Sequence, residues 1–324
     1  MFRFTRPVAK HAELICLSLR ESGQLHADVF EMQKGDLSTR SPGAYSGGVS
    51  NAASKRIILM SIIGTVDRLW RYPVKSMRGE TVAQAFLGFA GIHGDRIFAF
   101  HSSVSPKGFP YLTAREQRSL LRCQPRFRRP EKTLLPANLA DAEALAPGLG
   151  LTTALADAAD FMVDVELPTG ESLAIDDPAL LRALRDGVHG APELTLLRSD
   201  RALTDCRPVS LISVQTAQQL AAEIGGPEDA RRFRANINLD LNNSDGFAED
   251  GLVGRSLRIG ATAVISILQR DGRCALITFD PDTGESNPTV LKRITQAHEG
   301  MAGVYAAVLV EGIVRQGDAV EVVN

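Results

Sequence analysis

The chain has only four cysteines, and they lie far apart, at Cys16, Cys123, Cys206 and Cys274. The 324 residues contain no Cys-x-x-Cys pair and no histidine-rich tract. This spacing argues against a disulfide framework and against a structural zinc site. It also argues against an iron–sulfur cluster in this chain, because such a cluster needs several closely spaced thiolates. A reducing cytoplasm is therefore the compartment that we expect.

The chain also lacks a strong net charge and a long hydrophobic run. Its formal net charge is −2 at pH 7, so bulk charge gives no reason to expect nucleic acid or an anionic membrane as a partner. The apolar run IILMSIIG, from Ile57 to Gly64, is too short to span a bilayer and too far from the N-terminus for a signal peptide. The six histidines are scattered and lack the HExxH spacing of zinc hydrolases. The composition predicts a soluble globular protein without a membrane span.

The composition divides the chain into three parts. Residues 1–59 include LSTRSPGAYSGGVSNAASKR, which is rich in Ser, Gly and Ala and has little periodicity. We interpret this part as a disordered extension, or as the product of a start codon placed too early, with Met60 as the functional beginning. A targeting segment is the alternative. The length predicts two domains, which we assign to residues 60–190 and 191–324.

Short strand-like segments dominate the chain after Met60, and helices are few. Predicted helices begin after Asp177, Ser213 and Asn287, and the first two of these residues are good N-caps. Segments such as SLRIGATAVISILQR and CALITFD have the composition of strands. The pattern predicts a β-dominated α+β fold, with a barrel-like architecture and a few helices.

Two basic clusters could hold an anion. In YPVKSMRG, a proline-stiffened loop presents Lys75 and Ser76, and the segment GDR adds Arg96. In RFRANI, Arg234 and Asn236 are two residues apart, so an extended backbone would point both to one face. For each cluster taken alone, a solvated surface segment is the alternative.

Cys274 lies in the stretch DGRCALITFDPDTGE. A free cysteine is most often a small buried hydrophobe, but the neighbouring Arg273 would favour a thiolate, which attacks electrophiles or binds soft metals. One thiolate cannot hold a bare ion, so a metal would have to arrive with other ligands. The acidic residues of DPDTGE lack the spacing of an EF-hand, and a Pro/Gly turn is the preferred interpretation.

Five motifs occur in one order between residues 65 and 323: LWRYPVKSMRG, GDR, LTARE, RFRANI and RCALITFDPDTG. Together they resemble the molybdenum cofactor sulfurase C-terminal (MOSC) family, and most closely its two-domain members, the amidoxime-reducing components. The resemblance implies an N-terminal β-barrel-like domain followed by a MOSC β-barrel domain, with a molybdenum–pyranopterin cofactor between them. It implies that Cys274 is the protein ligand of molybdenum and that Asp205 is a polar group near the metal. The residues that it implies near the cofactor's phosphate and pterin are Lys75, Ser76, Arg96, Arg234, Asn236 and Arg273.

The resemblance also implies an activity, the reductive removal of oxygen from N-hydroxylated or N-oxide small molecules. The cofactor would carry this chemistry, while the protein supplies binding, orientation and electrostatics. No ferredoxin-like domain follows the last motif, so we expect electrons from a separate reductase or iron–sulfur protein. Two alternatives stay open: a sulfur carrier that uses a Cys274 persulfide, and a non-catalytic cofactor binder.

Overall fold

The computed structural model describes residues 61–144, 157–243 and 245–323. The predictions made for residues 1–59 therefore lie outside the described residues. The family resemblance covers the part of the chain that is described. The described residues all belong to the compact unit of residues 58–324.

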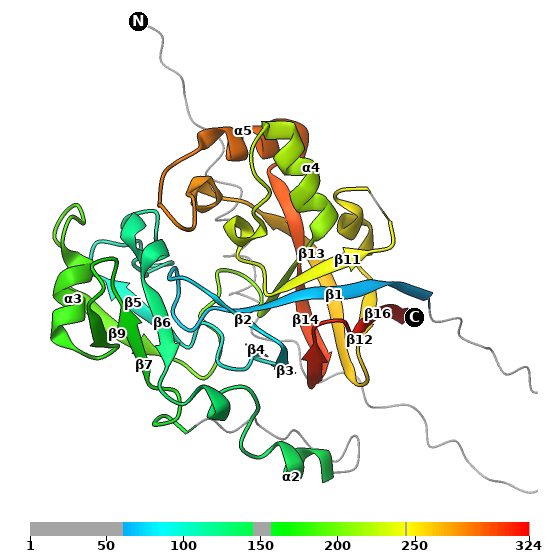
Figure 1. Ribbon diagram of the computed structural model, residues 1–324, viewed down its shortest axis with the longest axis horizontal. Helices are drawn as coiled ribbons and strands as arrows, with labels where there is room; N and C mark the ends of the chain where they lie inside the picture. Colours follow the sequence, from blue (N-terminus) through cyan, green and yellow to red (C-terminus); the bar gives the residue numbers. More distant parts are fainter. Residues whose placement is uncertain (1–60, 145–156, 244, 324) are drawn as a thin grey trace, which may run out of the picture. The chain divides into compact units, whose positions relative to one another are not determined.

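A closed barrel of seven strands forms the larger part of this unit (Figure 1). Six of the seven neighbouring pairs are antiparallel, and only β10 and β11 run parallel. The interior is filled by aliphatic side chains, among them Leu69, Leu211 and Ile265, which are fully buried. In barrel order, the strands are β11 (Ile237–Leu241), β10 (Val209–Ser213), β14 (Met301–Val310), β13 (Ala263–Gly272), β12 (Ser256–Ile259), β16 (Ala319–Val323) and β1 (Ser61–Arg71).

The first described strand, β1, closes this barrel although it precedes the other six strands by more than a hundred residues. It pairs with β11 on one side and with β16 on the other, as Figure 1 shows for the blue, yellow and red strands. Gly64 lies opposite Leu241, and a Cβ atom there would come within 2.2 Å of the Asp240 carbonyl oxygen. Only glycine allows the two backbones to approach so closely.

Two smaller sheets, β5–β9 and β6–β7–β8, pack around a second core, whose large members include Phe98, Phe100 and Phe161. A third small sheet pairs β15 with β3, which lie far apart in the sequence, and it contributes Leu87 and Val314 to the barrel core. The predicted boundary near residue 190 stays a prediction. The strands outside the barrel are β2 (Glu80–Val82), β3 (Gln84–Gly88), β4 (Gly91–Ile92), β5 (Phe98–Ser102), β6 (Gln124–Phe127), β7 (Val163–Glu166), β8 (Ser172–Ala174), β9 (Leu194–Arg198) and β15 (Gly312–Arg315).

The helices begin where their cap residues predict. The Asp177, Ser213 and Asn287 side chains each accept a hydrogen bond from a backbone N–H of the first turn. No helix in the described part of the chain is long and apolar enough to cross a membrane. The helices are α2 (Leu139–Ala144), α3 (Pro178–Arg185), α4 (Val214–Ile224) and α5 (Pro288–Ala297), and the 3-10 helices are η1 (Arg118–Arg122), η2 (Pro130–Lys132), η3 (Ala230–Phe233), η4 (Ala248–Leu252) and η5 (Ala275–Thr278).

The prediction of a β-dominated α+β fold with a barrel and a few helices is confirmed. One strand prediction is wrong: CALITFD forms the 3-10 helix η5, not a strand. Phe279, after the helix, makes only an isolated bridge to Ser286. The apolar residues of CALITFD show no strand periodicity, so the sequence does not distinguish a strand from a 3-10 helix there. Ile277 and Thr278 of η5 are buried.

Candidate functional site

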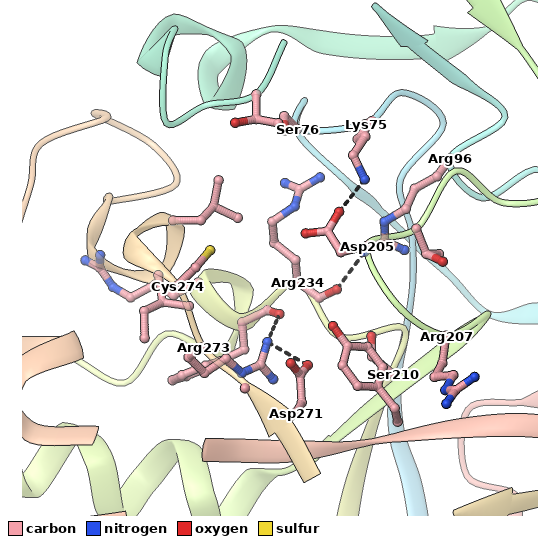
Figure 2. A pocket seen from close by; sticks show the side chains of 18 of the residues that line it. Lys75, Ser76, Arg96, Asp205, Arg207, Ser210, Arg234, Asp271, Arg273 and Cys274 are labelled. Atoms are coloured by element: carbon pink, nitrogen blue, oxygen red, sulfur yellow. Dashed lines mark hydrogen bonds and ion pairs between the residues drawn. The ribbon is translucent and has the colours of Figure 1, made fainter. Parts of the chain in front are cut away.

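One pocket gathers all eight residues that the sequence predicted for the site, and Figure 2 labels all of them except Asn236. About 780 Å³ of space between protein atoms, part of it open to solvent, lies between the loop after β1, the loop before β10, η3 and the end of β13. The predicted residues that line it are Lys75, Ser76, Arg96, Asp205, Arg234, Asn236, Arg273 and Cys274.

Lys75 is held at the pocket wall by two elements. Its backbone N–H donates to the Phe98 carbonyl at 2.8 Å, which ties the proline loop to β5. Its ammonium group donates to the Leu203 carbonyl at 2.7 Å and forms an ion pair with Asp205. Burial lowers the pKa of Lys75, although Asp205 opposes that shift. The lysine side chain is therefore an almost buried cation with a single carboxylate partner.

Arg96 and Asn236 line the pocket next to each other. Arg96 Nη2 donates to the Arg234 carbonyl at 2.9 Å, and its Nη1 binds the Asp95 carboxylate. The Asn236 side-chain oxygen accepts from the Ser210 hydroxyl at 3.3 Å, which fixes the amide relative to β10. The two predicted clusters thus meet through direct hydrogen bonds, because the loop 94–96 lies against the turn that precedes β11.

Arg234 adopts a conformation that the sequence did not predict. Its φ is 52°, so it caps η3 in the left-handed region and is not part of an extended strand. The expectation that an extended backbone aligns Arg234 with Asn236 is wrong, but both side chains still line the pocket. The Arg234 guanidinium lies 4.2 Å from the centre of the Tyr72 ring. Burial lowers the pKa of Arg234 to about 10.

Tyr72 is a site residue that the sequence analysis missed. Arg96 also stacks on its ring, at 4.6 Å, so one buried aromatic ring supports two cations of the pocket. Burial raises the pKa of the Tyr72 hydroxyl to about 12, which keeps it neutral. The signal was present in YPVKSMRG, since an aromatic residue next to an arginine-rich anion site is a natural stacking partner.

Arg273 and Cys274 occupy the opposite side of the pocket in the view of Figure 2. Arg273 is fixed by hydrogen bonds to the carbonyls of Phe233 (2.8 Å) and Ala302 (2.7 Å) and by an ion pair with Asp271 (2.9 Å). Cys274 is exposed, and its backbone forms the N-cap of η5 without a capping hydrogen bond from its side chain. The exposure of Cys274 therefore excludes the interpretation that this residue is a small buried hydrophobe.

The pocket is strongly cationic although the whole chain is not. Seven basic side chains and only two carboxylates line it. Arg234 Nη2 and Arg273 Nη2 are buried and have no hydrogen-bond partner in the described residues. Leaving such N–H groups unpaired is costly unless a ligand accepts their hydrogen bonds. The pocket therefore has the composition of an anion site, with a thiol at its edge.

Two further lining residues, Asp271 and Tyr305, were not predicted as site residues. They lie on the paired strands β13 and β14, with Asp271 near the end of β13 and Tyr305 in the middle of β14. Their approach depends on strand register, which no local sequence signal specifies. No cluster of three or more histidine, cysteine or acidic residues that could hold a metal ion by itself occurs in the described ranges.

Two family models match the chain. Residues 63–171 match the MOSC N-terminal beta barrel domain, and residues 189–321 match the MOSC domain. Among solved structures, the YuaD protein from Bacillus subtilis is 14% identical, with 82% of this chain and 98% of that chain covered and a TM-score of 0.40. YiiM from Geobacillus stearothermophilus is 24% identical, with 36% of this chain and 55% of that chain covered and a TM-score of 0.30. No curated protein matches the chain.

Proposed function

Because the chain belongs to the MOSC domain family and carries the MOSC N-terminal beta barrel domain, we propose that its cationic pocket binds a molybdenum–pyranopterin cofactor. The reaction that we propose is the reductive removal of oxygen from N-hydroxylated or N-oxide small molecules. The single observation that carries the proposal is the combination of one exposed thiol, Cys274, with a buried set of cations in the same pocket.

The donor set fits such a group. The unpartnered Nη2 atoms of Arg234 and Arg273 are strong donors for phosphate or for the polar edge of a pterin. The Lys75 ammonium adds a point charge, and the Asn236 amide offers both a donor and an acceptor. Cys274 supplies one soft ligand, which suits a metal whose remaining ligands come with the cofactor.

The chain's own residues have separate tasks in this proposal. Lys75, Arg96 and Arg234 neutralise the phosphate, while Asn236 orients the pterin and Cys274 holds the metal. When bound, the cofactor would supply two-electron redox chemistry. Asp205 keeps the Lys75 ammonium in place at the pocket wall. The electrons come from a separate donor protein, and the cytoplasm provides the reducing conditions that keep the thiol free.

A sulfur carrier is the second candidate function, and the exposure of Cys274 favours it. An accessible thiol can accept a sulfur atom as a persulfide and pass it to another acceptor. This function would use Cys274 without bound molybdenum, and the cationic pocket would then hold an anionic acceptor.

The deciding experiment measures three quantities on protein purified from a host that makes the molybdenum cofactor. These are molybdenum per chain, cyanide-labile sulfur, and reduction of an N-hydroxylated compound with an artificial electron donor. Wild type, Cys274→Ala and the control Cys206→Ala are compared, since Cys206 is also exposed but does not line the pocket.

The proposal predicts about one molybdenum per chain and N-hydroxy reduction in wild type and in Cys206→Ala, with both lost in Cys274→Ala. Labile sulfur on Cys274 without molybdenum supports the sulfur carrier. Molybdenum retained in Cys274→Ala, without activity in any form, supports a non-catalytic binder.

A further inference from the structure

The pocket contains two carboxyl groups, Asp205 and Asp271, in opposite environments. Asp205 is exposed and contacts the Lys75 ammonium. Protein atoms around its carboxylate remove part of its hydration, which acts to raise its pKa, but the attraction of Lys75 outweighs this and holds the pKa of Asp205 below its ordinary value. Asp205 is therefore ionised at neutral pH and has no proton to give.

Asp271 is only 2% exposed and lies at the end of β13. Burial raises its pKa to about 6, although the neighbouring Arg273 opposes the shift. A carboxylic acid with a pKa near the working pH can hold a proton and release it, which is the property that general acid catalysis needs. Two carboxyl groups of one pocket whose pKa values are displaced in opposite directions are a recurrent sign of a divided acid–base role.

Asp271 faces charged and titratable groups from its own strand, from β14 and from the rest of the pocket. Arg273, two residues along the chain, forms an ion pair with it at 2.9 Å, and the Tyr305 hydroxyl on β14 donates a hydrogen bond to its side chain. Asp205 and Arg96 act from across the pocket, the first raising and the second lowering the pKa of Asp271. Arg273 and Tyr305 therefore both hold the carboxyl of Asp271, which also lines the pocket.

We propose that Asp271 donates a proton to the oxygen atom that leaves the substrate, and that Arg273 and Tyr305 position its carboxyl group for this transfer. The proposal rests on the oxygen removal put forward above. Reduction of R–NHOH to R–NH2 consumes two electrons and two protons and releases water. The N–O bond breaks, the nitrogen is reduced with the two electrons that the separate donor protein supplies, and Asp271 gives one of the two protons to the departing oxygen. The second proton comes from solvent, which also reprotonates Asp271.

The test compares wild type with Asp271→Asn, which keeps the size and polarity of the side chain but cannot titrate. Asp250→Asn is the matched control. Asp250 is also a partly buried carboxyl with a raised pKa and an arginine partner, Arg270 at 2.8 Å, but it does not line the pocket. Molybdenum per chain is measured for each protein, so that loss of the cofactor is separated from loss of the proton donor.

In wild type, kcat/KM is expected to be constant below pH 6 and to fall about tenfold per pH unit above it. Asp271→Asn is expected to lose on the order of 100-fold in kcat at pH 6, with little change in KM, with molybdenum retained and with this pH dependence abolished. Asp250→Asn should reproduce the wild-type profile. An Asp271 that only positioned Arg273 would leave the pH profile in place, and that result overturns the proposal.

A second readout does not require turnover. The infrared difference between wild type and Asp271→Asn, recorded as a pH titration, should show a protonated carboxyl that ionises near pH 6. Ionisation near the ordinary aspartate value of about 4 overturns the proposal whatever the activity. Wild-type protein that binds molybdenum but reduces no N-hydroxylated compound at any pH overturns the proposed function and this step with it. An active wild type with an unchanged profile in Asp271→Asn overturns the proton transfer alone.

Discussion

Arg231 and Asp282 form a two-point ion pair across 51 residues of sequence, with Nη1 3.0 Å from Oδ1 and Nη2 2.6 Å from Oδ2. Arg78 adds a third hydrogen bond to the same carboxylate, at 2.9 Å. The turn DPDTG is thereby attached to the loop 72–79 and to η3, both of which carry pocket residues. The aspartates of this turn form ion pairs with arginines. The turn thereby fixes the end of the segment that presents Cys274.

Replacing Asp282 with Asn should loosen this attachment. The ion pairs are half-exposed, so we expect a loss of no more than about 1 kcal/mol in the free energy of unfolding. Urea unfolding at low and high salt measures it, and high salt should reduce the difference from wild type. Glu285→Gln, in the same turn, is the control, because the Glu285 carboxylate makes no ion pair within the described residues. An equal loss in both variants would contradict the account.

Gly64→Ala should destabilise the barrel. The added Cβ atom meets the Asp240 carbonyl oxygen at 2.2 Å, so β1 and β11 must move apart. Overpacking of this kind costs about 1–3 kcal/mol. Gly108→Ala is the control, since a Cβ atom there meets nothing within 4 Å. Thermal unfolding of the two variants should differ clearly, and equal midpoints would show that β1 does not close the barrel as described.

Glu223 should stabilise the contact between α4 and α5 in a pH-dependent way. Burial acts to raise its pKa, but hydrogen bonds from Gln219, His298 and Arg293 outweigh burial and lower it to about 2. A carboxyl with a lowered pKa in the folded state contributes stability that is present above its unfolded value of 4.5 and lost as the pH falls toward 2.

The variant Glu223→Gln is therefore expected to lose about 1–3 kcal/mol of unfolding free energy at pH 7 and progressively less below pH 4.5. Urea unfolding at pH 7 and at pH 3 tests this. Glu228→Gln, whose side chain is exposed, should match wild type at both values. A loss for Glu223→Gln that does not depend on pH would refute the electrostatic explanation.

Arg234→Lys should weaken anion binding in the pocket. Lysine keeps the positive charge but not the planar fork, and it cannot stack on Tyr72 in the same way. We expect cofactor-free protein to bind pyrophosphate about tenfold more weakly in this variant, by calorimetry. The control Arg198→Lys lies outside the pocket and should change nothing. Equal affinity of wild type and Arg234→Lys would remove Arg234 from the anion site.

The sequence predicted the parts of this structure that depend on local chemistry. The caps at Asp177 and Ser213 are local, because one side chain and one backbone N–H decide them. The site residues were predicted through motifs, and the pocket brings all eight together.

The sequence analysis missed features that depend on contacts between residues far apart in the chain. The closure of the barrel by β1 depends on pairing with strands near the other end of the chain. The left-handed backbone at Ser76, Arg96 and Arg234 has no sequence signal, because such positions usually favour glycine or asparagine. Three of the six non-glycine residues with positive φ in the described ranges line this one pocket, as expected where a binding site constrains the backbone.

The proposed function requires that the Cys274 thiolate binds the metal of the cofactor. X-ray absorption at the molybdenum edge tests it most directly, on wild type and on Cys274→Ser, with Cys206→Ser as the control. The account predicts that Cys274→Ser has one sulfur neighbour fewer than wild type and that Cys206→Ser has the same number. An unchanged sulfur count in Cys274→Ser, at full molybdenum content, would contradict it.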